Sequence, residues 1–262
     1  MRASAFALVA LCLTLAPAAG ASAYPGDPGY PDDPNYSDNP NYSSYPNRPN
    51  DYGYSGYSGY SRYSNDQDYS GEGARSARIE PGLNQAVLTE INYVRAHPSA
   101  FAQKLRRYRQ QFQGRLVYDG YSQRMTNEGV AAVDEAIAFL ERQRPLPALS
   151  TSSPLAHAAA DHVSDQGARG SIGHISSSGQ TPSQRMRRYG AMAGVTAETI
   201  SYGETTAEGV VRAFIVDDGV RDRGHRADVF DNYLRFAGVA CGAHRVYRAM
   251  CVVDFSGPLT AR

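Results

Sequence analysis

The chain has 262 residues with 26 basic and 26 acidic side chains, so its formal net charge is zero. This balance gives no overall preference for nucleic acid or for an anionic membrane surface, and we expect no nucleic-acid partner. The sequence also has no Gly-x-Ser-x-Gly elbow, no His-x-x-x-His helix pair and no glycine-rich phosphate loop. The missing serine elbow counts against a serine hydrolase.

Residues 1–23 have the features of an export signal. A positive start precedes an apolar run over residues 6–15, and Ala21-Ser22-Ala23 is a small-residue cleavage site before Tyr24. The apolar run is too short for a membrane-spanning helix. A lipoprotein signal is not expected either, because Cys12 lies inside the apolar run and follows Leu11, where a lipoprotein has a small residue. We therefore expect a mature chain without a transmembrane segment that is secreted or periplasmic.

Residues 24–79 are rich in Tyr, Ser, Gly, Pro, Asn and Asp and contain almost no aliphatic side chains. Such a composition buries too little apolar surface to offset chain entropy, which predicts a disordered tail. Its evenly spaced tyrosines suggest a segment that adheres to glycan, cell wall or other copies of itself. A passive spacer is the alternative.

Residues 80–262 are long enough for one domain with a single core. Apolar residues recur at helical spacing in six segments, and Ala237 to Phe255 has the pattern of a β-hairpin around a polar turn. Helices followed by a terminal hairpin predict an α+β layered domain. Ser153 and Gly167 are the expected ends of one of the helices. The helices are expected near residues 87–94, 98–105, 130–140, 153–167, 182–188 and 207–214.

Two cysteines remain after the signal is removed, Cys241 and Cys251. They flank the turn of the expected hairpin almost symmetrically, as residues opposite each other on its two strands would. In an oxidising compartment such a pair predicts a disulfide, with two free buried thiols as the alternative.

Two histidines of the fourth helix have ordinary roles in this interpretation. His162 falls on the apolar face of the helix, where a hydrogen-bonded core histidine is expected. His157 lies off this face and is expected to be solvated.

Two further histidines and two acids are the candidate functional residues. His174 lies in a Gly- and Ser-rich loop, Glu198 in a short strand, and His225 in a charged loop. The second acid is Asp217, one turn after Phe214, although Asp218 is an open alternative. Their spacing is not helical, so only tertiary structure can bring them together. Imidazole and carboxylate groups bind divalent cations or hold each other by charge-assisted hydrogen bonds.

Six short segments follow one another in a recognisable order. They are Leu88-Thr89-Glu90-Ile91-Asn92-Tyr93-Val94-Arg95, Gly173-His174, Ala197-Glu198-Thr199-Ile200, Phe214-x-x-Asp217, Gly224-His225-Arg226 and Val252-Val253-Asp254-Phe255. In this order, over roughly residues 83–257, they resemble the CAP superfamily of cysteine-rich secretory, antigen 5 and pathogenesis-related 1 proteins, especially its bacterial SCP-like members.

The resemblance implies a three-layer α–β–α sandwich with a central antiparallel sheet. It also implies a cleft lined by two histidines and two acids, which map onto His174, Glu198, Asp217 and His225. In some members this cleft binds zinc or another divalent cation, which makes His174 and His225 the expected metal ligands. Asp217 stands where the family usually has the longer glutamate.

Three functions are compatible with these observations. The first is a secreted, non-catalytic binding module that holds a small ligand, a lipid, a cell-wall component or a divalent cation. The second is a metal-dependent hydrolase, such as a peptidase, in which Glu198 or Asp217 polarises a bound water. The third is a surface or matrix protein that acts through its tyrosine-rich tail.

Overall fold

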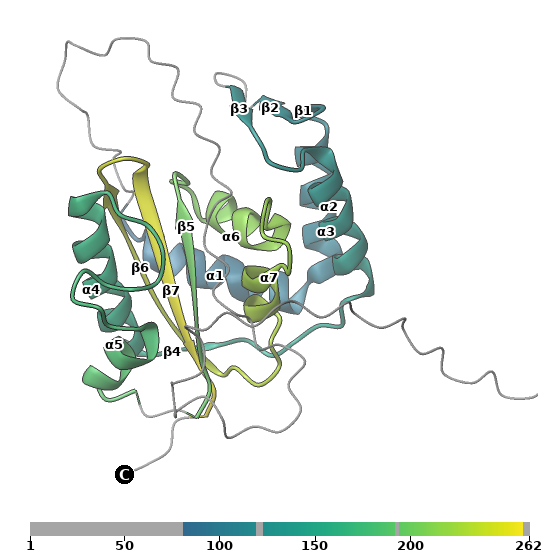
Figure 1. Cartoon of the computed structure of the whole chain (residues 1–262). Helices are drawn as coiled ribbons and strands as arrows, with labels where there is room; N and C mark the ends of the chain where they lie inside the picture. The colour runs from purple at the N-terminus through teal and green to yellow at the C-terminus, as the bar shows by residue number, and fades with distance from the viewer. Residues whose placement is uncertain (1–80, 119–122, 192–193, 259–262) are drawn as a thin grey trace, which may run out of the picture. The chain divides into compact units, whose positions relative to one another are not determined.

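The computed structural model of the protein describes residues 81–118, 123–191 and 194–258. The predicted export signal and tyrosine-rich tail lie outside these residues. In the described part a four-stranded sheet lies between two layers of helices (Figure 1). The α+β, three-layer architecture expected from the sequence is therefore the one observed.

The sheet has the strand order β4-β6-β7-β5. The hairpin β6–β7 forms its centre, and β5 pairs with β7 in antiparallel orientation. One strand departs from the expected antiparallel sheet, because the short β4 runs parallel to β6 and pairs only with its first two residues. The strands are β4 (Ser150–Thr151), β5 (Thr196–Tyr202), β6 (Phe236–His244) and β7 (Arg248–Ser256).

Helices cover both faces of the sheet (Figure 1). Helices α4 and α5 lie on one face, whereas α1, α6 and α7 lie on the other, and α2 and α3 pack together beyond α1 and α6. All six predicted helices are present; α7 and a small sheet of β1, β2 and β3 were not expected. The bounds are α1 (Leu83–Ala96), α2 (Pro98–Arg109), α3 (Val130–Arg142), α4 (Ser153–Arg169), α5 (Pro182–Arg188), α6 (Ala207–Val216), α7 (Gly224–Val229), β1 (Phe112–Gln113), β2 (Leu116–Tyr118) and β3 (Gln123–Met125).

Alternation along β7 separates two buried clusters. Cys251, Val253 and Phe255 belong to the large core with α1, α3 and α6. Met250 and Val252 belong to the smaller cluster beneath α4. Since successive side chains of a strand point to opposite faces, the even-numbered residues of β7 face α4 and α5.

The ends of α4 differ from those predicted. Its N-cap is Ser152 rather than Ser153, and it continues past Gly167 to Arg169, with Gly170 (φ 74°) as its C-cap. Gly167 has another role, because a Cβ there would lie 2.3 Å from the carbonyl oxygen of Ala243. A glycine at position 167 thus permits close packing of the helix on the sheet.

Helix α1 fixes the segment that leads into the sheet. Asn92 donates to the carbonyl of Leu149 (3.0 Å) and accepts from the N–H of Leu149 (2.8 Å). The fully buried Arg95 donates to the carbonyls of Pro147 (3.0 Å) and Val229 (2.6 Å). Burial lowers the pKa of Arg95 to about 10, which leaves it charged. These two side chains tie the first helix to β4 and to the end of α7.

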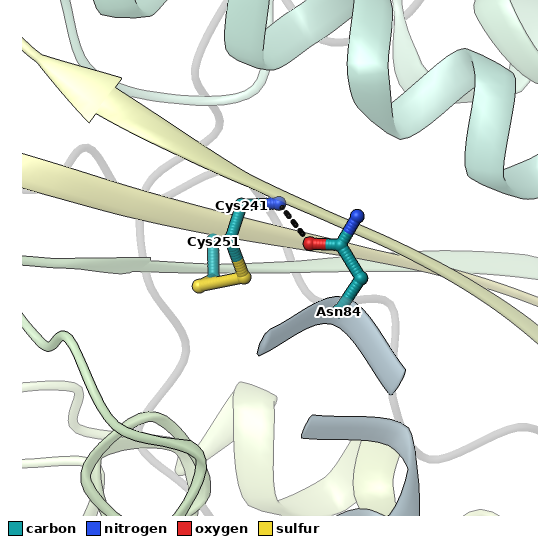
Figure 2. Close-up of a disulfide and its surroundings, with 3 residues drawn as sticks. All are labelled: Asn84, Cys241 and Cys251. Atoms are coloured by element: carbon teal, nitrogen blue, oxygen red, sulfur yellow. Dashed lines mark hydrogen bonds between the residues drawn. A yellow bond between two sulfur atoms is a disulfide. The ribbon is translucent and has the colours of Figure 1, made fainter. Parts of the chain in front are cut away.

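The predicted disulfide between Cys241 and Cys251 is present (Figure 2). It joins directly opposite residues of β6 and β7. The N–H of Cys241 points away from β7 and donates to Oδ1 of Asn84 on α1, at 2.9 Å. Asn84 therefore binds a backbone N–H of β6 that does not pair with the short strand β4.

None of the helices in the described ranges is both long and apolar enough to cross a membrane.

Candidate functional site

The candidate residues form two histidine–carboxylate pairs. Nδ1 of His174 lies 2.8 Å from Oε1 of Glu198, and Nδ1 of His225 lies 2.6 Å from Oδ1 of Asp217. In both pairs the imidazole donates Nδ1–H to an ionised carboxylate, which fixes the ring tautomer. Each predicted histidine is thus joined to one of the predicted acids.

His174 lies in the loop between α4 and α5, and neighbouring side chains fix this loop through its backbone. The carbonyl of Gly173 accepts from Nε2 of His162 (2.9 Å) and from Nε2 of Gln166 (2.6 Å). The N–H of Gly173 donates to the hydroxyl of Tyr202 (3.0 Å), which in turn donates to Oε1 of Gln166 (2.8 Å). The peptide before His174 is therefore held on both sides.

His162 is the hydrogen-bonded core histidine that the sequence predicted, and the exposed His157 is outside the site. Burial lowers the pKa of His162, which keeps its imidazole neutral so that Nε2–H can donate. His244 has a similar role at the start of the loop. Its Nδ1 accepts the N–H groups of Val246 and Tyr247, so its Nε2 donates to the carbonyl of Ser171 at 2.9 Å.

Glu198 projects from β5 toward α4 and α5 and is held between His174 and Arg185. Arg185 is almost fully buried and contacts the second carboxylate oxygen of Glu198. The same guanidinium donates to the carbonyls of His174 (2.8 Å) and Gln180 (3.1 Å). Burial would raise the pKa of Glu198, but the His174 hydrogen bond and the Arg185 charge outweigh it and lower the pKa to about 2. Glu198 is ionised at every physiological pH.

Asp217, one turn after Phe214, lies at the end of α6 and not within it. It is the C-cap of α6 in the left-handed region (φ 55°), and its carboxylate turns toward the start of α7. Oδ2 accepts the backbone N–H groups of His225 (3.0 Å) and Arg226 (3.3 Å), while Oδ1 binds the imidazole of His225. Asp217 therefore supplies acceptors for the first turn of α7, where backbone N–H groups lack helical partners.

His225 belongs to α7, although a loop was expected at this position. Burial lowers the pKa of His225, but the Asp217 carboxylate more than compensates and the net shift is upward. Arg226 donates to the carbonyls of Ile215 (2.6 Å) and Val216 (3.2 Å) at the end of α6. These bonds connect the two helices that carry this pair.

The alternative acid, Asp218, has a different function. Its two carboxylate oxygens accept the backbone N–H groups of Asn127 and Glu128, both at 2.7 Å. It therefore ties the end of α6 to the segment before α3, and the choice between the two acids falls on Asp217.

The two pairs differ in exposure between their members. The side chains of His174 and His225 are 17% and 10% exposed, whereas those of Glu198 and Asp217 are 1% and 2% exposed. A molecule arriving from solution would therefore meet the imidazoles and not the acids. Among the residues that the structure describes, no three His, Cys, Asp or Glu side chains are grouped as metal ligands.

Several residues that shape this site carry no signal in the sequence. Arg185 lies in a short arginine-rich helix and Gln166 and Tyr202 lie in ordinary helical and strand patterns. A buried side chain on the sheet, Asp254 of β7, lies directly opposite Glu198. The alternation of residues along the strand predicts which face Asp254 occupies, but it does not predict that Glu198 lies opposite.

Two solved structures show a partial likeness to the chain. An extracellular protein containing an SCP domain, from Bacillus anthracis str. Ames, is 17% identical with a TM-score of 0.37, over 49% of this chain and 38% of its own. An outer surface protein from Borrelia burgdorferi is 21% identical with a TM-score of 0.37, over 43% of this chain and 79% of its own. The chain thus spans well under half of the Bacillus anthracis protein.

The comparison with curated proteins gives no match. The model of the cysteine-rich secretory protein family, CAP, matches residues 88–255. This range contains both histidine–carboxylate pairs, the disulfide and all of the four-stranded sheet except its last residue, Ser256. It covers more than half of the chain, and the protein therefore belongs to the CAP family.

Proposed function

We propose that the protein works outside the cytoplasm as a non-catalytic binding module, in which His174 and His225 make the polar contacts to a ligand. The supporting observation is that both acids are already engaged. Each carboxylate uses both oxygens to accept hydrogen bonds from the protein's own groups. Both acids are also almost fully buried. An acid in this state orients an imidazole and is poorly placed to activate a water molecule.

The extracytoplasmic location rests on two further observations. The N-terminal 23 residues have the pattern of an export signal, and the disulfide of the hairpin suits an oxidising compartment. The ligand classes to test first are a cell-wall polymer and a lipid surface. Both offer hydroxyl, amide or phosphate oxygens, which accept hydrogen bonds from imidazole N–H groups.

Co-sedimentation of the whole chain with purified peptidoglycan and with phosphatidylglycerol vesicles tests this proposal. We expect the protein to sediment with one of them and the variant His174→Ala/His225→Ala to remain in solution. His157→Ala is the matched control, because it removes an exposed histidine of α4 outside the site. Equal sedimentation of the double variant would contradict a role of the two histidines.

The tail offers the competing explanation of any adhesion. A chain without residues 24–79 should bind as the whole chain does if the two histidines carry the function. Loss of binding in this truncated chain would instead assign adhesion to the tail. Cleavage of a peptide library in the presence of metal, lost in the double variant, would favour the hydrolase hypothesis.

A divalent cation, zinc above all, is a second ligand that we propose for the same histidines. Their donor type suits zinc, and a carboxylate bound to the second ring nitrogen is the usual support of a metal-ligating histidine. Two imidazoles would fill only two of the four positions of a tetrahedral site. Any zinc would thus be held weakly, with the other positions left to solvent or ligand.

Calorimetric titration with zinc chloride checks this expectation. We expect weak binding at neutral pH that disappears in His174→Ala/His225→Ala and persists in His157→Ala. Binding should also weaken as the pH falls, because protons compete for the imidazoles and the Asp217 carboxylate raises the pKa of His225. Unchanged zinc binding in the double variant would place the cation elsewhere.

A further inference from the structure

A second acid lies beside Glu198 beneath α4 and α5. In the antiparallel pairing of β5 and β7, Glu198 is directly opposite Asp254, and on the other side Asp254 is opposite Gly238 of β6. Directly opposite residues of antiparallel strands point to the same face with their Cβ atoms about 5 Å apart. Two carboxyl groups are therefore neighbours on the buried face of the sheet.

Asp254 has no visible means of carrying a negative charge. It is fully buried, and neither of its carboxyl oxygens accepts a hydrogen bond from the N–H or O–H groups of the described residues. Glu198, by contrast, binds both His174 and Arg185. Because a buried, unpaired carboxylate next to another carboxylate is strongly unfavourable, the proton must remain on one member of the pair. The charge that has hydrogen-bond and ionic partners is that of Glu198, so the proton belongs on Asp254.

The groups around Asp254 agree with this assignment. Glu198 faces it from β5 and Arg185 from α5, and Gly238 of β6 adds no side chain. Helix α4 approaches the sheet here with its backbone, since a Cβ on Gly238 would lie 2.0 Å from the nitrogen of Ala156. Burial raises the pKa of Asp254 well above its ordinary value and the Glu198 charge raises it further, although Arg185 acts in the opposite direction.

We propose that Asp254 is protonated at neutral pH and donates its O–H to the Glu198 carboxylate, which makes it a positioning residue for His174. Each oxygen of Glu198 has two lone pairs, so a third hydrogen bond leaves those of His174 and Arg185 in place. The chain of contacts then runs from Asp254 through Glu198 to the imidazole. The importance of these contacts for ligand binding rests on the proposed function. The proton shared by Asp254 and Glu198 does not depend on that function.

NMR of the whole chain labelled with ¹³C at the aspartate carboxyl groups tests the protonation state. The signal of Asp254 is assigned by its absence in Asp254→Asn. We expect it to keep the shift of a neutral acid through neutral pH, after exposed aspartates have titrated near their ordinary pKa of about 4. Titration of Asp254 together with the exposed aspartates would overturn the proposal.

The ring ¹⁵N shifts of His174 test the positioning role. Asp254→Asn keeps an N–H donor for Glu198, so the Nδ1–H tautomer of His174 should persist at the wild-type shifts. Asp254→Ala removes the donor and should alter these shifts. Ser256→Ala is the control, because it removes another fully buried polar group from the same face of β7.

Two results would contradict the positioning role. One is a His174 signal that Asp254→Asn disturbs as much as Asp254→Ala, and the other is a signal that neither variant moves. The wild-type titration decides the protonation state even where Asp254→Ala does not fold. A failure to bind peptidoglycan, vesicles or zinc would refute the proposed function without affecting either NMR result.

Discussion

Three buried carboxyl groups show three ways of keeping an acid inside the protein. Glu198 is ionised and is compensated by Arg185 and His174. Asp217 is bound by two backbone N–H groups and by His225. Asp254 has neither kind of partner, and we infer that it avoids ionisation. The environment of each acid, rather than its identity, sets its chemical state.

The pH dependence of stability should show that Asp254 is protonated in the folded protein. The raised pKa of Asp254 means that, above its ordinary value of 3.8, the folded chain holds a proton that the unfolded chain has lost. Wild-type stability therefore falls with rising pH through this window, by about 1.4 kcal/mol per pH unit from this group. Asp254→Asn lacks this proton, so urea unfolding at about pH 5, 6 and 7 should show its stability rising steadily relative to wild type.

The contributions of other titrating groups to stability cancel when Asp254→Asn is compared with wild type. Glu198, with its pKa lowered to about 2 from 4.5, contributes stability that is present above pH 4.5 and is lost as the pH falls toward 2. His225, whose pKa is raised above 6.5, contributes stability that is lost as the pH rises through the folded value. Both groups are present in both chains. A difference between the chains that stays constant with pH would show that Asp254 is ionised in the folded protein.

At the level of elements, the β6–β7 hairpin is the strand pair of the described sheet that carries a covalent cross-link. Its disulfide closes a short loop across directly opposite residues, and Cys251 lies in the large core. Cys241→Ala/Cys251→Ala should lower the free energy of unfolding by about 2–3 kcal/mol, because the unfolded chain regains the entropy of the open loop. Urea unfolding measures this loss.

Reduction of the wild-type protein provides the control. A thiol reductant should bring the wild type close to the double alanine variant and should leave that variant unchanged. Equal unfolding midpoints of the oxidised wild type and the variant would show that the disulfide does not stabilise the fold.

Local signals in the sequence predicted six helices and the terminal hairpin, but not all of their ends. The apolar stripes and prolines located the six helices, since these features act within one or two turns. Gly167 was wrongly predicted to end α4. A glycine is needed there for close packing against Ala243, a residue distant in sequence. Helix α7 was missed because six residues are too few for a periodic pattern, and it depends on Asp217 for its first turn.

Across the whole molecule, the sequence predicted which residues make up the candidate site but not how they are arranged. The order of short motifs pointed to His174, Glu198, Asp217 and His225, and the structure joins them as two pairs. Arg185 and Asp254 could not be found in this way, because their link to Glu198 arises from helix packing and strand register. Such contacts exist only once the layers have assembled.

One consequence of the sheet's architecture concerns association between copies of the chain. Strand β4 pairs only with Phe236 and Ala237, so the remainder of β6 lies beyond the reach of its neighbour. A strand edge without a partner strand can act as a template for cross-chain β-pairing and aggregation. The amide of Asn84 already satisfies the N–H of Cys241 on this edge. The first turn of α1 therefore occupies an N–H group that a strand of a second copy would need for pairing, and it is also part of the core.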